Sequence, residues 1–304
     1  MKKTLLTLTV LATVFAATPA SAASRDVVHF DLAAGQQPEN VALEPDGSAD
    51  VTFAGARQVA RVDRAGRTRI LATLPAPGGG GAPALGFPLT TGIVRTSDGS
   101  LYVLYATGTD DLTGLWRLRP GGTPQRIAAL PGNGLPNGLA FDGRRFYVTD
   151  SVLGTVWTVP FLGGTAKSWS TAAELAPAGF LGANGAKLHD GALWVTNLDR
   201  GTVLRIPILP DGRAGTPRVK ATDVPGIDDF TFTGRGDEIL AALDSPNKVV
   251  RIGADGVAST VLDATDGLQN PTSIAVRGKE VYVFSAAYLT QTDPNLLRTT
   301  LARC

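Results

Sequence analysis

A chain of 304 residues with 43% hydrophobic and 18% charged residues has the composition of a globular protein, not of a disordered one. Its formal net charge of +1 and the lack of a basic stripe argue against nucleic acid or an anionic membrane as a partner. The single cysteine, Cys304, excludes an intramolecular disulfide and a thiolate zinc site.

The first 22 residues have the features of a signal peptide. Lys2 and Lys3 form a basic start, an apolar run follows over 5–17, and the small residues 20–22 supply a cleavage site. The apolar run is too short to cross a bilayer, and no later stretch approaches the required length. We therefore expect a secreted or periplasmic protein. An uncleaved membrane anchor is the alternative.

One phrase recurs through the rest of the chain, and it consists of a turn, a short apolar strand, a corner and a second strand. Residues 135–151 spell it as LPNGLAFDGRRFYVTDS, with an Asp-Gly corner and an Asp-Ser end. The same plan returns with other residues at 38–53, 90–105, 183–198, 227–243 and 271–284.

The residue that opens each first strand serves as a marker of the repeat. The markers, separated by 52, 46, 47, 44 and 44 residues, are Glu39, Thr91, Asn137, Asn184, Asp228 and Thr272. A period in this range, built from strands without a helical pattern, is typical of a β-propeller. We predict an all-β fold with six four-stranded blades, forming a single domain over residues 23–304.

Two further strands follow the repeated pair in most blades. They are expected at 58–63 and 68–74, 155–159 and 166–169, 202–206 and 217–221, and 248–252 and 258–262. The last blade has only three candidates, at 272–276, 280–285 and 296–301. We predict that the N-terminal strand over 27–32 supplies its fourth strand, because closing the ring removes open sheet edges.

Two insertions, 74–90 and 171–183, are rich in Gly and Pro and join an outer strand to the next inner strand. This connection places them on the same face as the markers. Loops of this kind often carry function, so we expect a lid or an entry lip. Tolerated surface insertion is an equally good alternative.

The inner strands of a propeller line its channel, so the six markers should meet at one mouth. They offer carboxylate, amide and hydroxyl oxygens but no imidazole or thiolate, which suits Ca²⁺ better than Zn²⁺. Glu39 and Asp228 would also repel each other unless a cation lay between them. The sequence therefore predicts a Ca²⁺ site, or one for another divalent cation, formed by Glu39, Asn137, Asn184 and Asp228. The alternative is that these are ordinary turn residues at strand starts.

The phrases PNGLAF…FYVTDS, NGAKL…LWVTN…GTVLRIPI, GIDDFTF and NPTSIAV resemble the senescence marker protein (regucalcin)/gluconolactonase group of six-bladed propellers. Paraoxonases and strictosidine-synthase-like proteins are related to that group. The resemblance implies a divalent-cation-dependent hydrolase of lactones or phosphotriesters that uses the same four ligands. It also implies Asp228 as nucleophile or general base, with Asp229 as a substitute or as the residue that orients Asp228.

Substrate contacts are expected from residues near the ring, namely Thr91, Thr272, Asp150 and Asn197. Five loops on the marker face should contribute to the pocket, and they are 107–111, 150–153, 197–200, 244–247 and 286–295.

The two histidines argue against a Ser-His-Asp triad. His189 is expected in a surface turn at the far end of its strand from Asn184, and His29 on the closing outer strand. The side chains that bind sugar lactones in some relatives have no match here. We expect a monomer with a small-molecule substrate. A non-catalytic propeller with a structural cation, or an enzyme of the lyase or condensation type, are the alternatives.

Overall fold

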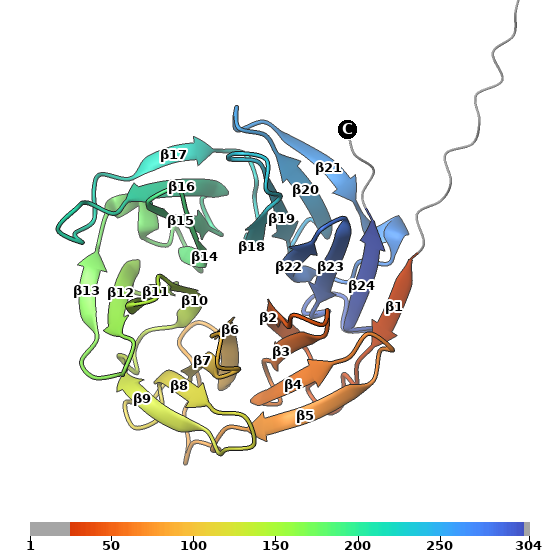
Figure 1. Ribbon diagram of the computed structural model, residues 1–304, viewed down its shortest axis with the longest axis horizontal. Helices are drawn as coiled ribbons and strands as arrows, with labels where there is room; N and C mark the ends of the chain where they lie inside the picture. The colour runs from red at the N-terminus through yellow and green to blue at the C-terminus, as the bar shows by residue number, and fades with distance from the viewer. Residues whose placement is uncertain (1–24, 301–304) are drawn as a thin grey trace, which may run out of the picture.

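Six four-stranded antiparallel sheets stand around a common axis in the computed structural model, which describes residues 25–300 (Figure 1). The predicted six-bladed β-propeller is therefore confirmed. The predicted signal peptide and Cys304 lie outside the described residues. No helix in the described part of the chain has the length and apolar character needed to span a membrane.

From the axis outward, the first three blades are β2 (Pro38–Leu43), β3 (Ala49–Phe53), β4 (Gln58–Val62) and β5 (Thr68–Thr73); β6 (Leu89–Arg95), β7 (Leu101–Ala106), β8 (Gly114–Leu118) and β9 (Gln125–Ala129); and β10 (Pro136–Phe141), β11 (Arg145–Asp150), β12 (Thr155–Pro160) and β13 (Lys167–Ser170). The next two are β14 (Ala183–His189), β15 (Ala192–Asn197), β16 (Thr202–Pro207) and β17 (Arg218–Ala221); and β18 (Ile227–Phe232), β19 (Ile239–Leu243), β20 (Lys248–Ile252) and β21 (Ala258–Leu262). Two short 3₁₀ helices, η1 (Ala173–Leu175) and η2 (Ala264–Asp266), lie between blades.

The ring is closed by the two ends of the described chain, as the sequence predicted. Blade six consists of β22 (Pro271–Arg277), β23 (Glu280–Ser285), β24 (Asn295–Thr300) and β1 (Asp26–His29). Asp26 pairs with Arg298 in the antiparallel register of β1 and β24. Just beyond β1, the Phe30 ring packs edge-on against Phe53 of blade one, with centroids 5.0 Å apart.

The core lies between neighbouring blades and not at the axis. Second strands are buried along all or nearly all of their length, as in β7, because each blade packs against a neighbour on both faces. Tyr102 of β7 packs on Phe146 of the next blade, with ring centroids 4.6 Å apart. Outer strands such as β5 are mostly exposed. Burial of a large apolar side chain contributes about 1.5–3 kcal/mol, so the second strands hold the blades together.

A β-bulge interrupts the inner strand of every blade at its marker. In β10, Pro136 pairs with Asp150 and Leu139 with Val148, so the inner strand has one extra residue there. Shifts at the corresponding place occur in all the other inner strands. Because a bulge turns a side chain out of the regular alternation, each marker is free to point away from the sheet.

Candidate functional site at one mouth of the channel

The four predicted ligands meet in one cavity. Glu39, Asn137, Asn184 and Asp228 all line a space of about 340 Å³ at the mouth where the inner strands begin. Each is the second residue of its inner strand, and each is at most 7% exposed. The bulged start of the strand, repeated around the ring, therefore brings side chains 189 residues apart in the chain to one place.

Glycines follow three of the markers, Thr91, Asn137 and Asn184, and let the inner strands approach one another. A Cβ on Gly138 would lie 2.2 Å from the carbonyl oxygen of Asn184, and one on Gly92 would lie 2.4 Å from that of Asn137. No real side chain tolerates such contacts. The glycines after Thr91 and Asn137 are thus required by the packing of one blade on the next, besides any role of the marker side chains themselves.

Hydroxyl groups fix the backbone of the ring from blade to blade. Thr196 donates a hydrogen bond to the carbonyl oxygen of Asp228 over 2.6 Å, and Thr52 donates to that of Thr91 over 2.7 Å. Thr149 donates in the same way to Asn184. Two predicted ligands are therefore held at their own carbonyl groups, so their side chains are positioned in the cavity by the scaffold.

Three carboxyl groups share the cavity without a basic partner. Burial raises the pKa of Glu39 to about 7; a hydrogen bond from Tyr288 opposes this rise, whereas the Asp244 and Asp229 charges add to it. Burial and the charge of Glu39 raise the pKa of Asp228 well above its usual value. Burial alone raises the pKa of Asp244 to about 6. Like charges out of water therefore favour protons here unless a cation replaces them.

Tyr288 is the only phenol of the described residues that lines this cavity. Its hydroxyl donates to Glu39 Oε2 over 2.6 Å. Burial raises the pKa of Tyr288 well above its usual value, and the neighbouring carboxylates add to the shift. The phenol therefore stays protonated at neutral pH and acts as a donor toward the cavity.

Two buried oxygens at the cavity lack a hydrogen-bond partner within the described part of the chain, Oδ1 of Asn184 and Oδ1 of Asp244. Such orphaned acceptors are destabilising in a dry site and are the groups a hard cation would take. No three His, Cys, Asp or Glu side chains of the described residues form a metal cluster by themselves. A cation here would therefore need the amide oxygens together with the carboxylates, and the donor set fits that requirement.

Asp229, the alternative catalytic residue, has a different environment. Its carboxylate accepts two hydrogen bonds from Lys187 Nζ, at 2.6 and 2.7 Å, and one from Asn40 over 3.1 Å. It is buried but is not one of the residues that line the cavity. Its charge is neutralised by Lys187, so it is placed to support the inner strand that carries Asp228.

The four predicted substrate contacts lie outside the cavity lining and bond to backbone groups. Thr91 and Thr272 donate to the carbonyl oxygens of Pro136 and Pro38, each over 2.8 Å. Asp150 accepts from the amides of Leu135, Val152 and Leu153, and the Asn197 amide donates to two carbonyl groups near η1. In this structure, all four are fully buried and join loops or blades.

Both predicted insertions reach the mouth. Their residues Leu85, Phe87 and Leu89, and Phe180 and Leu181, contribute to the cavity walls. A buried apolar cluster at the mouth contains Leu89 and Leu181 and anchors the insertions to the ring. At the rim, large apolar side chains stay exposed, with Phe180 48% and Leu289 64% accessible. The cavity therefore has a polar floor and apolar walls.

Asp244 and Tyr288 were not singled out from the sequence, although both fall in loops predicted on this face. Asp244 directly follows β19, and Tyr288 lies between β23 and β24. Neither occupies a marker position, so the repeat gave no signal for it.

His189 is the last residue of β14 and is stacked on Phe232, with centroids 4.0 Å apart, so the expected surface turn is wrong for it.

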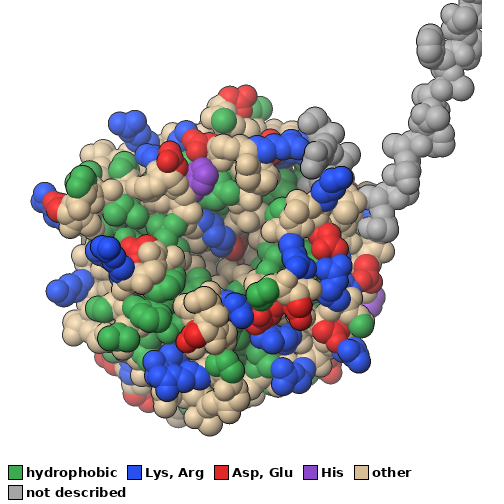
Figure 2. Space-filling model, in the orientation of Figure 1, with side chains coloured by type: hydrophobic (Ala, Val, Ile, Leu, Met, Phe, Trp, Pro, Cys, Tyr) green, Lys and Arg blue, Asp and Glu red, His purple; other side chains and the backbone are tan. Residues whose placement is uncertain are grey.

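Seen along the axis, the molecule is hollowed at its centre, and basic and acidic side chains are interspersed over the visible face (Figure 2). No single basic patch covers that face. The hollow lies where the inner strands face one another in the ribbon view (Figure 1).

The sequence has no matching family model and no match among curated proteins. Solved structures do match. A gluconolactonase from Xanthomonas campestris has a TM-score of 0.65 at 16% identity, over 94% of this chain and 99% of that one. A luciferin-regenerating enzyme has a TM-score of 0.64 at 14% identity, over 91% and 95%.

A virginiamycin B lyase from Staphylococcus aureus is similar as well, with a TM-score of 0.61 at 13% identity, over 92% of this chain and all of that one. Identities this low show that the fold is shared and do not extend to the chemistry. The assignment of a function therefore depends on the residues in the cavity.

Proposed function

We propose that this protein is an exported hydrolase of lactones or related esters that depends on a divalent cation, and the oxygen donors of the site favour Ca²⁺. The observation that carries the proposal is the convergence of Glu39, Asp228 and Asp244 on one buried cavity that has no basic partner in its lining. The orphaned oxygens of Asn184 and Asp244 support the same conclusion. Three like charges and two unpartnered acceptors are unfavourable in a structural core and useful around a cation.

Glu39, Asn137, Asn184 and Asp228 would hold the cation, and Asp244 is a further candidate ligand. When bound, a divalent cation polarises an ester carbonyl and stabilises negative charge on its oxygen. These residues come from four different blades, so the rigid ring fixes their positions before any ligand arrives. The same arrangement would lower the reorganisation needed in the transition state.

Asp228 is the residue proposed to carry the chemistry. As a general base it would take a proton from water while the water oxygen bonds to the carbonyl carbon. The bond between that carbon and the leaving oxygen then breaks, and the leaving oxygen takes up the proton. Direct attack of the Asp228 carboxylate on the carbonyl carbon is the second route, and water would hydrolyse the resulting acyl intermediate.

The walls of the cavity favour an apolar ester or lactone over a sugar. Leucine and phenylalanine side chains surround the polar floor, and Phe87, Phe180 and Leu289 are partly exposed at the rim. Apart from the two asparagines, the polar, uncharged side chains of the lining are Gln37, Gln291 and Tyr288. A sugar would leave most of its hydroxyl groups without partners against such walls.

The fold shared with a gluconolactonase and a luciferin-regenerating enzyme is compatible with membership in the gluconolactonase-like group, which we propose for this chain. The basic start and apolar run of residues 1–22 support export, and the small cavity supports a small-molecule substrate. We propose that the mature protein acts as a monomer.

A panel of lactones and aryl esters tests the proposal. Hydrolysis should be lost on chelation and restored by Ca²⁺, and Asp228→Asn should reduce kcat/KM by at least about a thousandfold, as expected for removal of a base or nucleophile. Asp190→Asn is a matched control, because that carboxylate is 82% exposed and lies outside the cavity lining. Activity that survived chelation, or the double variant Glu39→Gln/Asp228→Asn, would remove the mechanism.

Two alternative functions give other results in the same assay. A binding propeller with a structural cation would melt at a lower temperature after chelation but would hydrolyse no member of the panel. A lyase would release an unsaturated product instead of taking up water, and mass spectrometry of the product in H₂¹⁸O separates these reactions. Incorporation of one ¹⁸O atom into the acid is the result expected here.

A further inference from the structure

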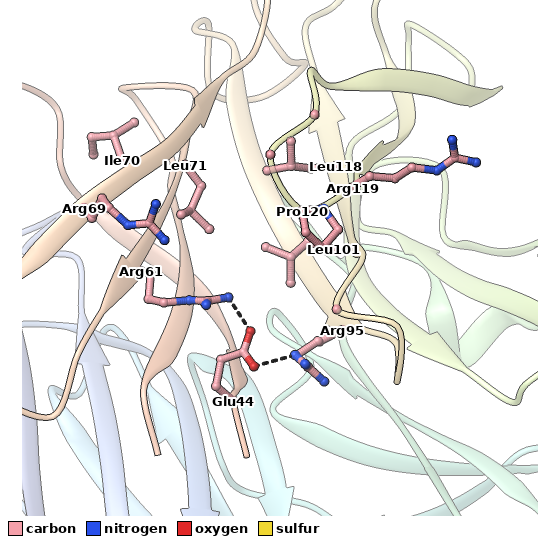
Figure 3. A pocket seen from close by; sticks show the side chains of 13 residues that line it. Glu44, Arg61, Arg69, Ile70, Leu71, Arg95, Leu101, Leu118, Arg119 and Pro120 are labelled. Carbon is pink, nitrogen blue, oxygen red and sulfur yellow. Dashed lines mark hydrogen bonds and ion pairs between the residues drawn. The ribbon is translucent and has the colours of Figure 1, made fainter. Parts of the chain in front are cut away.

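A second cleft opens between blades one and two on the opposite face from the cavity (Figure 3). Each inner strand starts at the cavity, so the turns between first and second strands lie at the other end of the ring. Glu44, which follows β2, and Gly99, which precedes β7, belong to such turns and line the cleft. Its volume of about 340 Å³ is large enough for a small organic molecule.

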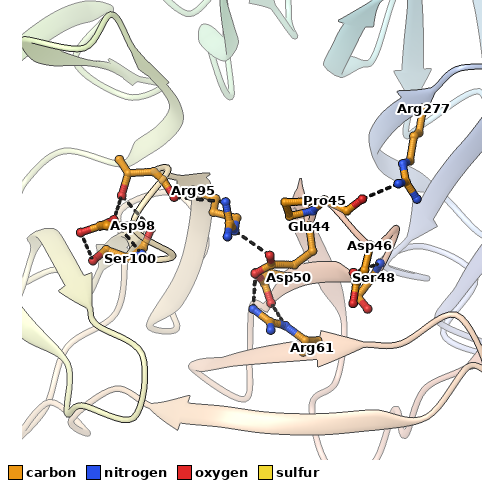
Figure 4. A network of polar contacts seen from close by, with 11 residues as sticks. Glu44, Pro45, Asp46, Ser48, Asp50, Arg61, Arg95, Asp98, Ser100 and Arg277 are labelled. Atoms are coloured by element: carbon orange, nitrogen blue, oxygen red, sulfur yellow. Dashed lines mark hydrogen bonds and ion pairs between the residues drawn. The ribbon is translucent and has the colours of Figure 1, made fainter.

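A row of charges crosses blade one at this cleft. Asp50, Arg61 and Arg69 face one another in register on β3, β4 and β5. Arg61 holds Asp50 with two hydrogen bonds, of 2.7 and 2.9 Å, and also bonds to Glu44. From blade two, Arg95 Nε lies 2.7 Å from Glu44 Oε2. Arg61 and Arg95 thus balance the charges of the two buried carboxylates, Asp50 and Glu44 (Figure 4).

Arg69 is the member of the row that has no counter-charge. It lies directly opposite Arg61, and like charges in directly opposed positions destabilise a sheet. Its guanidinium makes no hydrogen bond or ion pair with the described residues, although its backbone pairs within the sheet. Figure 3 shows its guanidinium directed toward Arg61 and the space between the strands, whereas that of Arg119 points away from the cleft. With Arg119 directed away, Arg61, Arg69 and Arg95 remain at the cleft, where the carboxylates of Glu44 and of the fully buried Asp50 balance two of the three charges.

Some apolar side chains lie beside these charges. Leu71 of blade one is half-buried against the core cluster that contains Leu101 and Leu118 of blade two, and Pro120 lies next to them (Figure 3). A guanidinium prefers the planar, two-oxygen geometry of carboxylate or phosphate. One free guanidinium with apolar side chains next to it suits a molecule with an anionic head and a short apolar chain.

We propose that this cleft binds a small amphiphilic oxyanion, with its carboxylate or phosphate head on Arg69 and on the outer edge of Arg61. Its apolar chain lies along Leu71, next to the cluster that contains Leu101 and Leu118. Arg61 keeps its bonds to Asp50 and Glu44 and contributes charge. The site is separate from the cavity, so it stands whether or not the proposed hydrolase function is correct.

Isothermal titration of the full mature protein tests the site with four probes. Hexyl phosphate and hexanoate carry both features, inorganic phosphate carries only the charge, and hexanol only the chain. We expect saturable binding of at least one of the first two, and binding at least about tenfold weaker for the last two, since each lacks one set of contacts. The stronger of the first two identifies the head group. Absence of saturable binding by both amphiphilic probes would overturn the proposal.

Variants locate the binding. Arg69→Gln should weaken it by about tenfold or more, because the variant loses charge-assisted hydrogen bonds to the head group. Arg119→Gln is the matched control and should stay within about twofold of the parent, because that guanidinium points away. Glu39→Gln in the cavity should leave the affinity unchanged. Equal losses in the two arginine variants, or loss of binding in Glu39→Gln, would place the anion elsewhere and overturn the proposal.

Discussion

A glutamate lies at each end of β2, and the charges around the two side chains are opposite in sign. Glu39 at the start of the strand faces other carboxylates, and its one hydrogen-bond donor is the phenol of Tyr288. Glu44, just beyond the end of the strand, lies between the guanidinium groups of Arg61 and Arg95. Both side chains are almost fully buried, at 7% and 8% exposure. Burial therefore does not distinguish the two residues, but their counter-charges do.

This difference separates a structural carboxylate from a functional one. Burial raises the pKa of Glu44, but hydrogen bonds to Asp50 and Arg95 and the two arginine charges bring it below its usual value. The pKa of Glu39 is raised to about 7. The ionised form of Glu44 is stabilised by the arginines around it and requires no further counter-charge. The ionised form of Glu39 is destabilised by the fold and would be stabilised by a bound cation. Asp50 is intermediate, because its burial outweighs Arg61 and raises its pKa to about 6.

The largest effect on stability is expected from Arg61→Met, which removes one of the two arginine partners of Glu44. This variant leaves Asp50 and Glu44 buried without their main partner, and we expect a loss of about 3–5 kcal/mol in the free energy of unfolding. Urea denaturation measures it. Arg67→Met is the matched control, since Arg67 is 83% exposed in its pair with Asp63, and it should change stability by less than about 0.5 kcal/mol. Equal effects would show that the Glu44 network contributes no more than a surface pair.

The same substitution at both ends of β2 tests the comparison itself. At pH 8 and without divalent cations, Glu39→Gln should raise the free energy of unfolding by about 2–3 kcal/mol, because it removes an anion that the fold disfavours. Glu44→Gln should lower it by about 1–2 kcal/mol, because it removes an anion held by two arginines. Chemical denaturation of both variants gives the sign of each change in the free energy of unfolding. Two changes of the same sign would contradict the proposed difference between Glu39 and Glu44.

The pH dependence of the parent protein follows from the unpaired carboxyl groups. The pKa of Glu39 is raised to about 7 and that of Asp244 to about 6, so between about pH 4 and 7 the folded state binds more protons than the unfolded state. Their contribution is present at low pH and is lost as the pH rises through the folded pKa values. In EDTA, stability should therefore fall by at least about 2 kcal/mol from pH 5 to pH 8. Added Ca²⁺ should reverse most of this fall, because it binds the ionised folded state. A flat profile in EDTA would contradict the prediction.

The sequence was sufficient for the architecture because the repeat constrains it. Six markers at a nearly constant period predicted the blades, and the three-strand last blade predicted that the N-terminal strand closes the ring, as β1 does. The four markers with carboxylate or amide side chains were predicted to form one site, and they line one cavity. Periodicity carries this information because each blade repeats the same bulged start of the inner strand.

Residues outside the repeat could not be assigned in this way. Asp244 and Tyr288 reach the cavity from loops whose shape depends on tertiary packing, so the spacing of the repeat does not predict their positions. The same limit applies to Asp150 and Asn197, which are on the correct face but turn inward to satisfy loop amides and carbonyl groups. Whether a polar side chain at a strand end faces solvent, substrate or backbone is decided by its neighbours in space. The row of charges on blade one and its link to Arg95 of blade two were missed for the same reason, since these contacts join different strands and two blades.

The smallest expected effect comes from removing the hydroxyl group of Tyr288, which bonds to Glu39 at the start of β2. Tyr288→Phe keeps the apolar ring but removes the hydrogen bond to Glu39, which lowers the pKa of that carboxyl group in the parent. The pKa of Glu39 should rise further, and the midpoint of the pH-dependent loss of stability in EDTA should move up by about one pH unit. Protons would then compete with Ca²⁺ at higher pH, so the apparent Ca²⁺ affinity at pH 7 should fall several-fold and recover at pH 8.5 or above.

Tyr282→Phe provides the control for this last prediction, because Tyr282 is also buried and donates to a carboxylate, Glu280, outside the cavity. It should leave the pH midpoint and the Ca²⁺ affinity unchanged. If Tyr288→Phe instead raised Ca²⁺ affinity at all pH values, the phenol would be a competitor for Glu39 and not its support. The carboxylate that the fold leaves without a basic partner would then depend on the cation alone, and the contrast between the two ends of β2 would be sharper still.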